Sequence, residues 1–350
     1  MNHHLFLHCR AGFEKECAAE ITELAAGHNI NGYAKTSDNQ AYVLFIINSA
    51  ADGITLLEKL PFTKVCFTRQ WFVGLHQATE LLVTDRVSSI LAIAEQLPAV
   101  NEVFVETFDT NDGKELSTLA RKLNGPILGA LQKTANWQSN ALYRLHVVLI
   151  NGTSAWIGVS LRDNSSEWPM GIPRLRLAHA APSRSALKLE EAWHLFIPDK
   201  ERTRRLSAKH RAVDLGAAPG GWSWQLTQLG MHVIAVDNGP LQAALLESGK
   251  VIHIRHDAFR FQPEKPVHWL VCDMVEQPNR VAELMAQWFV NQWCQEAIFN
   301  LKLPMKKRYL ALQDALERIH RITRTARLRL EINYKQLYHD REEVTVYARY

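Results

Sequence analysis

The second half of the chain carries an aspartate at the end of each of four apolar runs, and a glycine-rich turn follows the first. These aspartates are Asp214, Asp237, Asp257 and Asp273. In a doubly wound α/β sheet the carboxyl ends of the parallel strands open on one crevice, and ligands bind there. An acid at the end of the second strand is suited to accept hydrogen bonds from a ribose hydroxyl pair. Four carboxylates grouped in this way indicate a cationic ligand that carries a ribose.

The glycine-rich turn, Gly216-Ala217-Ala218-Pro219-Gly220-Gly221, narrows the class of ligand. Its three glycines let the backbone approach a ligand closely. The spacing is not the GxGxxG pattern of dinucleotide-binding proteins, and the Lys-Ser/Thr pair of a P-loop is absent, so a pyrophosphate or triphosphate is disfavoured. S-adenosylmethionine, with a sulfonium charge, an adenosine and no phosphate, fits the pattern. A purely structural turn in a Rossmann-like domain is the alternative.

Alternating strand-like and helical segments predict the elements that position these residues. Five apolar runs are predicted strands: 212–215, 232–236, 251–255, 269–272 and 297–301. The spacing leaves room for helices between them, and such βα units form a mostly parallel, doubly wound sheet. Two further β-rich segments, 327–333 and 344–350, are joined by a polar turn. We therefore predict an α/β Rossmann-like domain whose sheet ends in an antiparallel pair.

The first half of the chain has a different organisation. Short strands alternate with amphipathic helices, and Asn151-Gly152 between two apolar runs is a strong hairpin signal. This pattern predicts two small α+β units, 1–75 and 76–162. A linker is predicted at 163–184, a stretch with three prolines, a polar cluster and no sustained periodicity.

Composition restricts the remaining function classes. Of the 350 residues, 47% are hydrophobic and 22% charged, which excludes a mostly disordered or fibrous chain. The net charge of +4 means that affinity for a polyanion must come from local basic patches. Five scattered cysteines without a CxxC pair indicate reduced thiols in the cytoplasm and no metal site. We also expect no signal peptide, no membrane contact and a monomer.

The second half resembles the FtsJ-type RNA ribose 2'-O-methyltransferases. The matching segments are 183–189, 214–222, 272–274, Lys302 in FNLKLP and Glu343 in REEVTVY. The resemblance implies a catalytic tetrad of two lysines, an aspartate and a glutamate. Its members here are Lys188, Asp273, Lys302 and Glu343. Glu343 is preferred to the adjacent Glu342 because the family's glutamate directly precedes the apolar strand.

The resemblance implies a role for each member. Lys302 is the predicted general base for a ribose hydroxyl and Lys188 the second cation, while Asp273 and Glu343 orient the pair. A lysine, whose reference pKa is about 10.4, must be tuned downward to act as a base near neutral pH. Burial and a nearby ammonium lower the pKa whereas carboxylates raise it, and the balance depends on desolvation that a sequence does not report.

The predicted cofactor contacts surround the same strand ends. Asp237 is assigned to the ribose hydroxyls, Asp257 to the adenine amino group and Asp273 to the region around the sulfonium. The other predicted contacts are Ser185, Gly216, Ala218, Pro219, Gly220 and Gly221, of which Ser185 and 218–221 face the methionine part.

The first half is similar to a ferredoxin-like domain (1–75) followed by a THUMP RNA-binding domain (76–162), ahead of an FtsJ-type domain (185–350). This combination resembles bacterial methyltransferases that modify a cytidine ribose in the peptidyl-transferase region of 23S rRNA. Because the crevice is generic and the net charge of +4 is small, we expect selectivity to lie largely in residues 1–160. We expect naked or partly assembled large-subunit rRNA as the partner. Two basic runs, 200–211 and 306–329, could attract phosphates, although a solvated helix face is an equal alternative for much of the second.

Two other functions remain open. One is a base methyltransferase on a THUMP scaffold, and the other is a non-catalytic rRNA assembly factor with a vestigial pocket. Cys272 adjoins Asp273 and could suggest the nucleophile of a 5-methylcytosine enzyme, but strand alternation turns it away from Asp273. The intact tetrad counts against the assembly factor.

Overall fold

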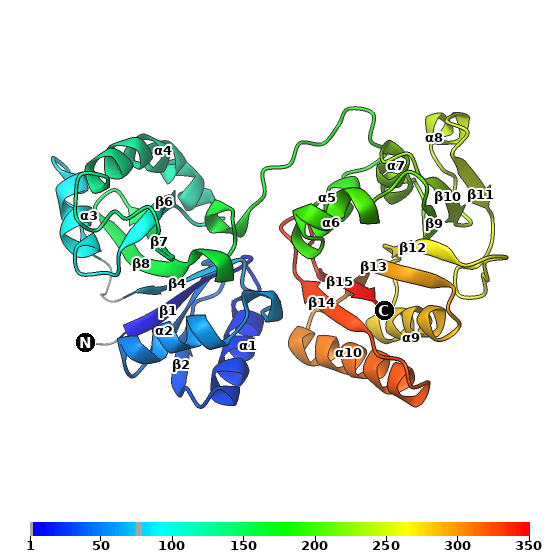
Figure 1. Cartoon of the computed structure of the whole chain (residues 1–350), viewed down its shortest axis with the longest axis horizontal. Coiled ribbons are helices and arrows are strands. Elements are labelled where there is room, and N and C mark those ends of the chain that lie inside the picture. Colours follow the sequence, from blue (N-terminus) through cyan, green and yellow to red (C-terminus); the bar gives the residue numbers. More distant parts are fainter. Residues whose placement is uncertain (1–2, 75–78) are drawn as a thin grey trace. The chain divides into compact units, whose positions relative to one another are not determined.

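The structure, a computed structural model, describes residues 3–74 and 79–350. The chain forms two compact units, Met1–Ile172 (unit 1) and Pro173–Tyr350 (unit 2). Each unit is built around one sheet with helices packed against it (Figure 1).

The sheet of unit 1 joins the two predicted α+β units. Its described strands are β1 (His3–His8), β2 (Gly32–Lys35), β3 (Tyr42–Ile47), β4 (Gln70–Gly74), β5 (Thr79–Glu80), β6 (Val100–Glu106), β7 (Tyr143–Asn151) and β8 (Ser154–Leu161). They lie in the order β2-β3-β1-β4-β8-β7-β6, and β5 pairs with β8. Because β4 pairs with β8, with Val73 opposite Val159, the two predicted units share one continuous sheet.

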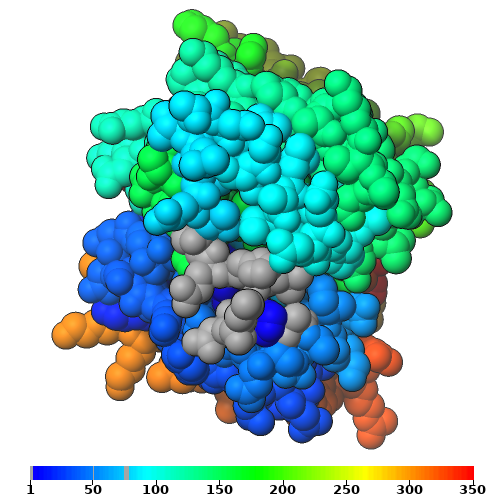
Figure 2. Space-filling model, turned by 90° about the vertical axis from the view of Figure 1, so that its left-hand side faces the viewer, coloured from blue at the N-terminus to red at the C-terminus, as the bar shows by residue number. Residues whose placement is uncertain are grey.

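Side-chain caps mark where three of the four described helices of unit 1 begin. The described helices are α1 (Glu14–Gly27), α2 (Ala50–Lys59), α3 (Arg86–Ala94) and α4 (Asn111–Leu131). Ser49, Asp85 and Thr110 each accept a backbone N–H from the first turn of α2, α3 and α4. Buried apolar residues such as Ile90 and Ile127 pack α3 and α4 on the sheet. Figure 2 shows a face of unit 1 on which its first half (blue) and the region of α3 (cyan) occupy separate parts.

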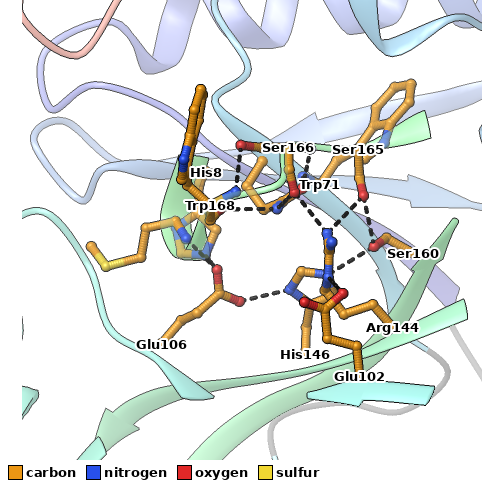
Figure 3. A network of polar contacts seen from close by, with 12 residues as sticks. His8, Trp71, Glu102, Glu106, Arg144, His146, Ser160, Ser165, Ser166 and Trp168 are labelled. Atoms are coloured by element: carbon orange, nitrogen blue, oxygen red, sulfur yellow. Dashed lines mark hydrogen bonds and ion pairs between the residues drawn. The ribbon is translucent and has the colours of Figure 1, made fainter. Parts of the chain in front are cut away.

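A buried polar network lies on the other face of this sheet (Figure 3). His146 Nδ1 is 2.7 Å from a Glu106 carboxylate oxygen, and His146 Nε2 is 2.8 Å from Ser160 Oγ. Glu106 also accepts a hydrogen bond from the backbone N–H of Met170. The network therefore connects the strands to a segment beyond β8.

The same network holds the first part of the predicted linker. Arg144 donates to the carbonyl oxygen of Ser166 at 2.7 Å. Trp71 donates its indole N–H to the carbonyl oxygen of Asn164 at 2.8 Å. Residues 163–171 are thus bound into unit 1, so the connection to unit 2 begins later than the sequence pattern indicates.

Unit 2 has the predicted Rossmann-like α/β sheet. Its strands are β9 (Arg211–Leu215), β10 (His232–Val236), β11 (Val251–Ile254), β12 (Val267–Cys272), β13 (Cys294–Lys302), β14 (Glu331–Lys335) and β15 (Glu343–Arg349). The order is β11-β10-β9-β12-β13-β15-β14. β9 to β13 are parallel, and β15 runs antiparallel to both β13 and β14. The order reverses between β9 and β12, which is where such sheets open a ligand crevice.

The helices of unit 2 depart from the prediction at one point. They are α5 (Ala186–Phe196), α6 (Asp199–Arg205), α7 (Gly221–Gln228), α8 (Ala243–Glu247), α9 (Pro278–Val290) and α10 (Arg308–Thr325). The interval between β11 and β12 leaves room for a helix, but residues 255–266 form an irregular loop. Pro263 and Pro266 disfavour a helix there, because each lacks a backbone donor and restricts the preceding residue.

Candidate active site

Four charged side chains from four elements meet at the carboxyl end of the unit 2 sheet. Lys188 lies on α5, Asp273 follows β12, Lys302 ends β13 and Glu343 begins β15. Lys188 Nζ is 3.2 Å from an Asp273 carboxylate oxygen and also contacts Glu343. Lys302 Nζ contacts Asp273 and lies 3.8 Å from Glu343. Each ammonium is therefore close to both carboxylates, and the four formal charges cancel.

The strand register explains this convergence. Lys302 lies directly opposite Glu343 across the antiparallel strands β13 and β15, and opposed side chains share one face of a sheet. β12 runs parallel to β13, so Asp273 leaves its strand at the same edge. Glu342 instead pairs with Arg308 at 2.7 Å. Glu343 is thus the glutamate that faces the two lysines, as the sequence analysis predicts.

The environment favours the charged form of two of these four side chains, Asp273 and Lys188. Burial alone would raise the pKa of Asp273, but the ammonium groups of Lys188 and Lys302 outweigh it and lower the pKa below its ordinary value. Burial alone would lower the pKa of Lys188, but Asp273, Asp340 and Glu343 outweigh it and raise the pKa. Lys188 therefore remains an ammonium ion at neutral pH.

A pocket of about 520 Å³ lies at the ends of the central strands. Its lining includes five of the predicted cofactor contacts: Gly216, Ala218, Asp237, Asp257 and Asp273. Gly216 has a φ of +73°, and a Cβ there would lie 2.2 Å from Met274 Cγ. Glycine is required at this position by both the left-handed backbone and the close approach.

The aspartates at the strand ends differ in their surroundings. Asp237 accepts hydrogen bonds from the backbone N–H groups of Ala218 (2.9 Å) and Gly239 (2.7 Å). Asp257 is exposed at the rim of the pocket. Asp214 is not part of the crevice, contrary to our prediction: it is buried and accepts a hydrogen bond from Ser223 Oγ at 2.7 Å. Burial raises its pKa to about 7.

Four predicted cofactor contacts, Ser185, Pro219, Gly220 and Gly221, are not among the residues that line this pocket. A Cβ on Gly221 would lie 2.4 Å from Ser185 Oγ, so this glycine permits close packing of α7 against the start of α5. Trp222 Nε1 donates to the carbonyl oxygen of Ser185 at 2.8 Å. These contacts position α5, the helix that carries Lys188.

Sequence reasoning missed several residues of the site. Additional lining residues include Asn238, His256, Met274, Glu276 and Arg280. Met274 lies in the matching segment 272–274, but it was not assigned a contact; the others lie in irregular segments or at a helix start, where neither periodicity nor a motif distinguishes them. Asn300 also belongs to the site, because it donates to Asp273 at 2.7 Å. The sequence contains one indication of this: Asn300 precedes Lys302 by two residues on the same strand, so both side chains lie on one face.

The two basic runs contain residues of different kinds. Arg205, in the first run, is buried and binds Glu296 and Glu201, so it stabilises the fold and is unavailable to a polyanion. Lys306 and Lys307 in the second run are exposed next to β13. The prediction that the first basic run, 200–211, attracts phosphates is therefore wrong for Arg205.

Two general properties of the described residues bear on function. Within 3–74 and 79–350, no helix combines the length and apolar character needed to cross a membrane. Within the same ranges, no three His, Cys, Asp or Glu side chains are grouped so that they could hold a metal ion.

Three segments of the chain match known families. Residues 1–72 match the "RlmM ferredoxin-like domain" and residues 85–161 match "Ribosomal RNA large subunit methyltransferase M, N-terminal". Residues 181–310 match "FtsJ-like methyltransferase". Among solved structures, TrmN from Thermus thermophilus aligns over 99% of this chain and 100% of its own, with a TM-score of 0.37 and 15% identity.

Curated relatives are similar over almost the whole chain. Ribosomal RNA large subunit methyltransferase M of Cellvibrio japonicus is 54% identical over 345 residues, which cover 99% of both chains. The protein of the same name from Edwardsiella ictaluri is 49% identical over 350 residues, which cover 99% of this chain and 93% of the relative.

Proposed function

The chain belongs to the family of ribosomal RNA large subunit methyltransferase M, and on that premise we propose that it methylates the 2'-hydroxyl of a cytidine ribose in 23S rRNA. It is an S-adenosylmethionine-dependent methyltransferase. The observation that carries the ribose assignment is the cluster of Lys188, Lys302, Asp273 and Glu343 beside the pocket. A hydroxyl nucleophile needs a group that accepts its proton and groups that align it.

Lys302 is the better candidate for the general base. Lys188 is the more buried lysine, with 12% of its side chain exposed against 18% for Lys302. The carboxylates around Lys188 hold its pKa above the ordinary value, which keeps it cationic. Lys302 lies farther from Glu343, at 3.8 Å, and ends the strand next to the exposed segment 304–307. In this proposal Lys302 first loses a proton to solvent, and its neutral Nζ then receives the hydroxyl proton, while Asp273 holds both lysines in place.

The pocket suits the cofactor. Its volume of about 520 Å³ falls in the range of small-molecule sites, and Asp237, Asp257 and Asp273 give it the negative charge that a sulfonium favours. When bound, S-adenosylmethionine supplies an electrophilic methyl group. Each Asp237 oxygen already accepts one backbone hydrogen bond and has a second lone pair for a ribose hydroxyl.

We assign recognition of the RNA mainly to unit 1, as a ferredoxin-like part (1–75) and a THUMP part (76–162). Naked or partly assembled 23S rRNA in the cytoplasm is the proposed substrate, and the protein is proposed to act as a monomer. The exposed Lys306 and Lys307, which follow Lys302 closely, are candidates for phosphate contacts.

The cysteine environment disfavours one form of the base-methylating alternative, an enzyme that makes 5-methylcytosine. Cys272 is fully buried, and burial raises the pKa of its thiol to about 12. A cysteine nucleophile acts as the thiolate, so this side chain is unsuited to attack a pyrimidine ring.

Methylation of a 23S rRNA transcript with isotopically labelled S-adenosylmethionine tests the proposal. Nuclease digestion and mass spectrometry should place the label on the ribose of a cytidine, and alkali should fail to cleave the adjacent bond. A label on the base would show the alternative enzyme. If calorimetry detected no binding of S-adenosylmethionine, the assembly-factor alternative would replace the enzyme.

A further inference from the structure

A second pair of side chains lies behind the charged residues, across the same two strands. Asn300 is opposite Thr345 in the register of β13 and β15, two residues from the pair Lys302 and Glu343. Residues two apart on a strand lie on one face of the sheet. Asn300 and Thr345 therefore lie on the tetrad's face, deeper in the protein, and both are fully buried.

A chain of short contacts connects this pair to the tetrad. Asn300 Nδ2 donates to Asp273 Oδ1 at 2.7 Å, and Asn300 Oδ1 lies 2.7 Å from Thr345 Oγ1. Thr345 Oγ1 also lies 3.1 and 3.0 Å from the two carboxyl oxygens of Asp340. Asp340 is buried, with 1% exposure, and its Oδ2 accepts the backbone N–H of Leu337 at 2.9 Å.

The number of protons on each side chain determines which group donates in each hydrogen bond of this chain. Ionised Asp273 only accepts, so Asn300 must turn its amide NH₂ toward Asp273 and its oxygen toward Thr345. A threonine hydroxyl has one proton, and the oxygen of Asn300 requires it. The contact between Thr345 and Asp340 then holds a proton only if the carboxyl group of Asp340 supplies it.

We propose that Asp340 is protonated at neutral pH and that Asp340, Thr345 and Asn300 form a positioning chain that holds Asp273 in the orientation required for methyl transfer. The part that concerns turnover rests on the proposed function, whereas the protonation of Asp340 does not.

The charges around Asp340 agree with a neutral carboxyl group. Burial and the neighbouring carboxylate of Glu343 raise the pKa of Asp340 well above its ordinary value, although Lys188 opposes this. Glu191 on α5 adds a further negative charge nearby. An ionised Asp340 would place an additional carboxylate next to the tetrad, whose own formal charges already cancel.

The role in turnover is tested with two substitutions at one residue. Thr345→Val keeps the branched shape and removes the hydroxyl, and Thr345→Ser keeps the hydroxyl. With RNA and S-adenosylmethionine we expect kcat of Thr345→Val to fall about 10-fold, which corresponds to about 1.4 kcal/mol of transition-state stabilisation. The KM for RNA and the Kd for S-adenosylmethionine should change less than about 2-fold. Thr345→Ser should recover most of the lost kcat.

Either of two results would overturn this role. One is a normal kcat for Thr345→Val, and the other is an equal loss of kcat in the valine and serine variants. If the wild-type protein did not methylate RNA, the proposed function would fail, and the protonation test below would still stand.

The protonation of Asp340 is tested by infrared difference spectroscopy of the full chain against Asp340→Asn at neutral pH. We expect the wild-type spectrum to contain the carbonyl stretch of a protonated carboxyl group that the variant lacks. The subtraction separates this band from that of Asp214, which both proteins retain. A carboxylate band in its place would show that Asp340 is ionised and would overturn the proposal. If Asp340→Asn did not fold, selective ¹³C labelling of aspartate carboxyls and a pH titration of the wild type would give the same answer.

Discussion

At the residue scale, the two lysines of the candidate active site have different surroundings although both contact Asp273. Lys188 contacts both Asp273 and Glu343 and is held as a cation, whereas Lys302 contacts Asp273 but lies 3.8 Å from Glu343 and is the more exposed of the two. We predict that Lys302→Ala lowers kcat by about 100-fold or more, since a positioned general base typically contributes about 10²–10⁴-fold. Calorimetry should show almost unchanged affinity for S-adenosylmethionine. Lys265→Ala, at an exposed lysine in the loop after β11, is the control. A near-normal rate for Lys302→Ala would refute the base assignment.

Substitution of Asp237 should weaken cofactor binding first, the reverse of what is expected for Lys302→Ala. Asp237 lines the pocket and holds the turn that begins at Gly216. Asp237→Ala removes the acceptor of two backbone N–H groups and of the proposed ribose contact. We expect a loss of affinity for S-adenosylmethionine of about 1.5–3 kcal/mol, the usual worth of charged hydrogen bonds. Glu264→Ala, at an exposed acid outside the pocket, should bind normally. Unchanged affinity of Asp237→Ala in calorimetry would exclude the assigned ribose contact.

At the element scale, the first strand of unit 1 makes its sheet sensitive to acid. Burial lowers the pKa of both His4 and His8 on β1 to about 4. Their pKa in the unfolded chain is about 6.5, so between these values the unfolded state binds more protons. The free energy of unfolding therefore falls as the pH decreases through this window, by at most about 3 kcal/mol for each histidine.

Urea titrations at about pH 7.5 and about pH 5 measure this effect. His8→Gln should unfold with a smaller pH dependence than the wild type, because one of the two titrating groups is lost. An equal pH dependence in both proteins would show that His8 contributes nothing to the acid sensitivity.

At the scale of the whole molecule, we propose that the division into two units separates methyl transfer from RNA selection. All four members of the charged cluster and the pocket lie within 173–350. We predict that a fragment of residues 173–350 binds S-adenosylmethionine with nearly full affinity, measured by calorimetry, and methylates 23S rRNA at a small fraction of the full-length rate. Full-length activity of the fragment would assign another role to unit 1.

The sequence by itself determined the features that depend on local patterns. Apolar runs separated at βα spacing indicated the parallel sheet of unit 2, and the turn at Gly216 followed from its glycines. Resemblance to a family added Lys188, Lys302 and Glu343, which no periodicity distinguishes from surface charges. The sequence did not predict the register that places Lys302 opposite Glu343, because it pairs two distant strands.

Only the tertiary structure decided the features that depend on pairing between distant segments. The joining of β4 to β8 and the attachment of residues 163–171 to unit 1 involve segments that lie far apart in the chain. The same is true of the contacts of Asn300 with Asp273 and Thr345. An aspartate at a strand end looks the same in the sequence whether it faces a pocket, as Asp237 does, or the interior, as Asp214 does. Burial and hydrogen-bond partners determine its charge and role, and both arise only when the whole chain has folded.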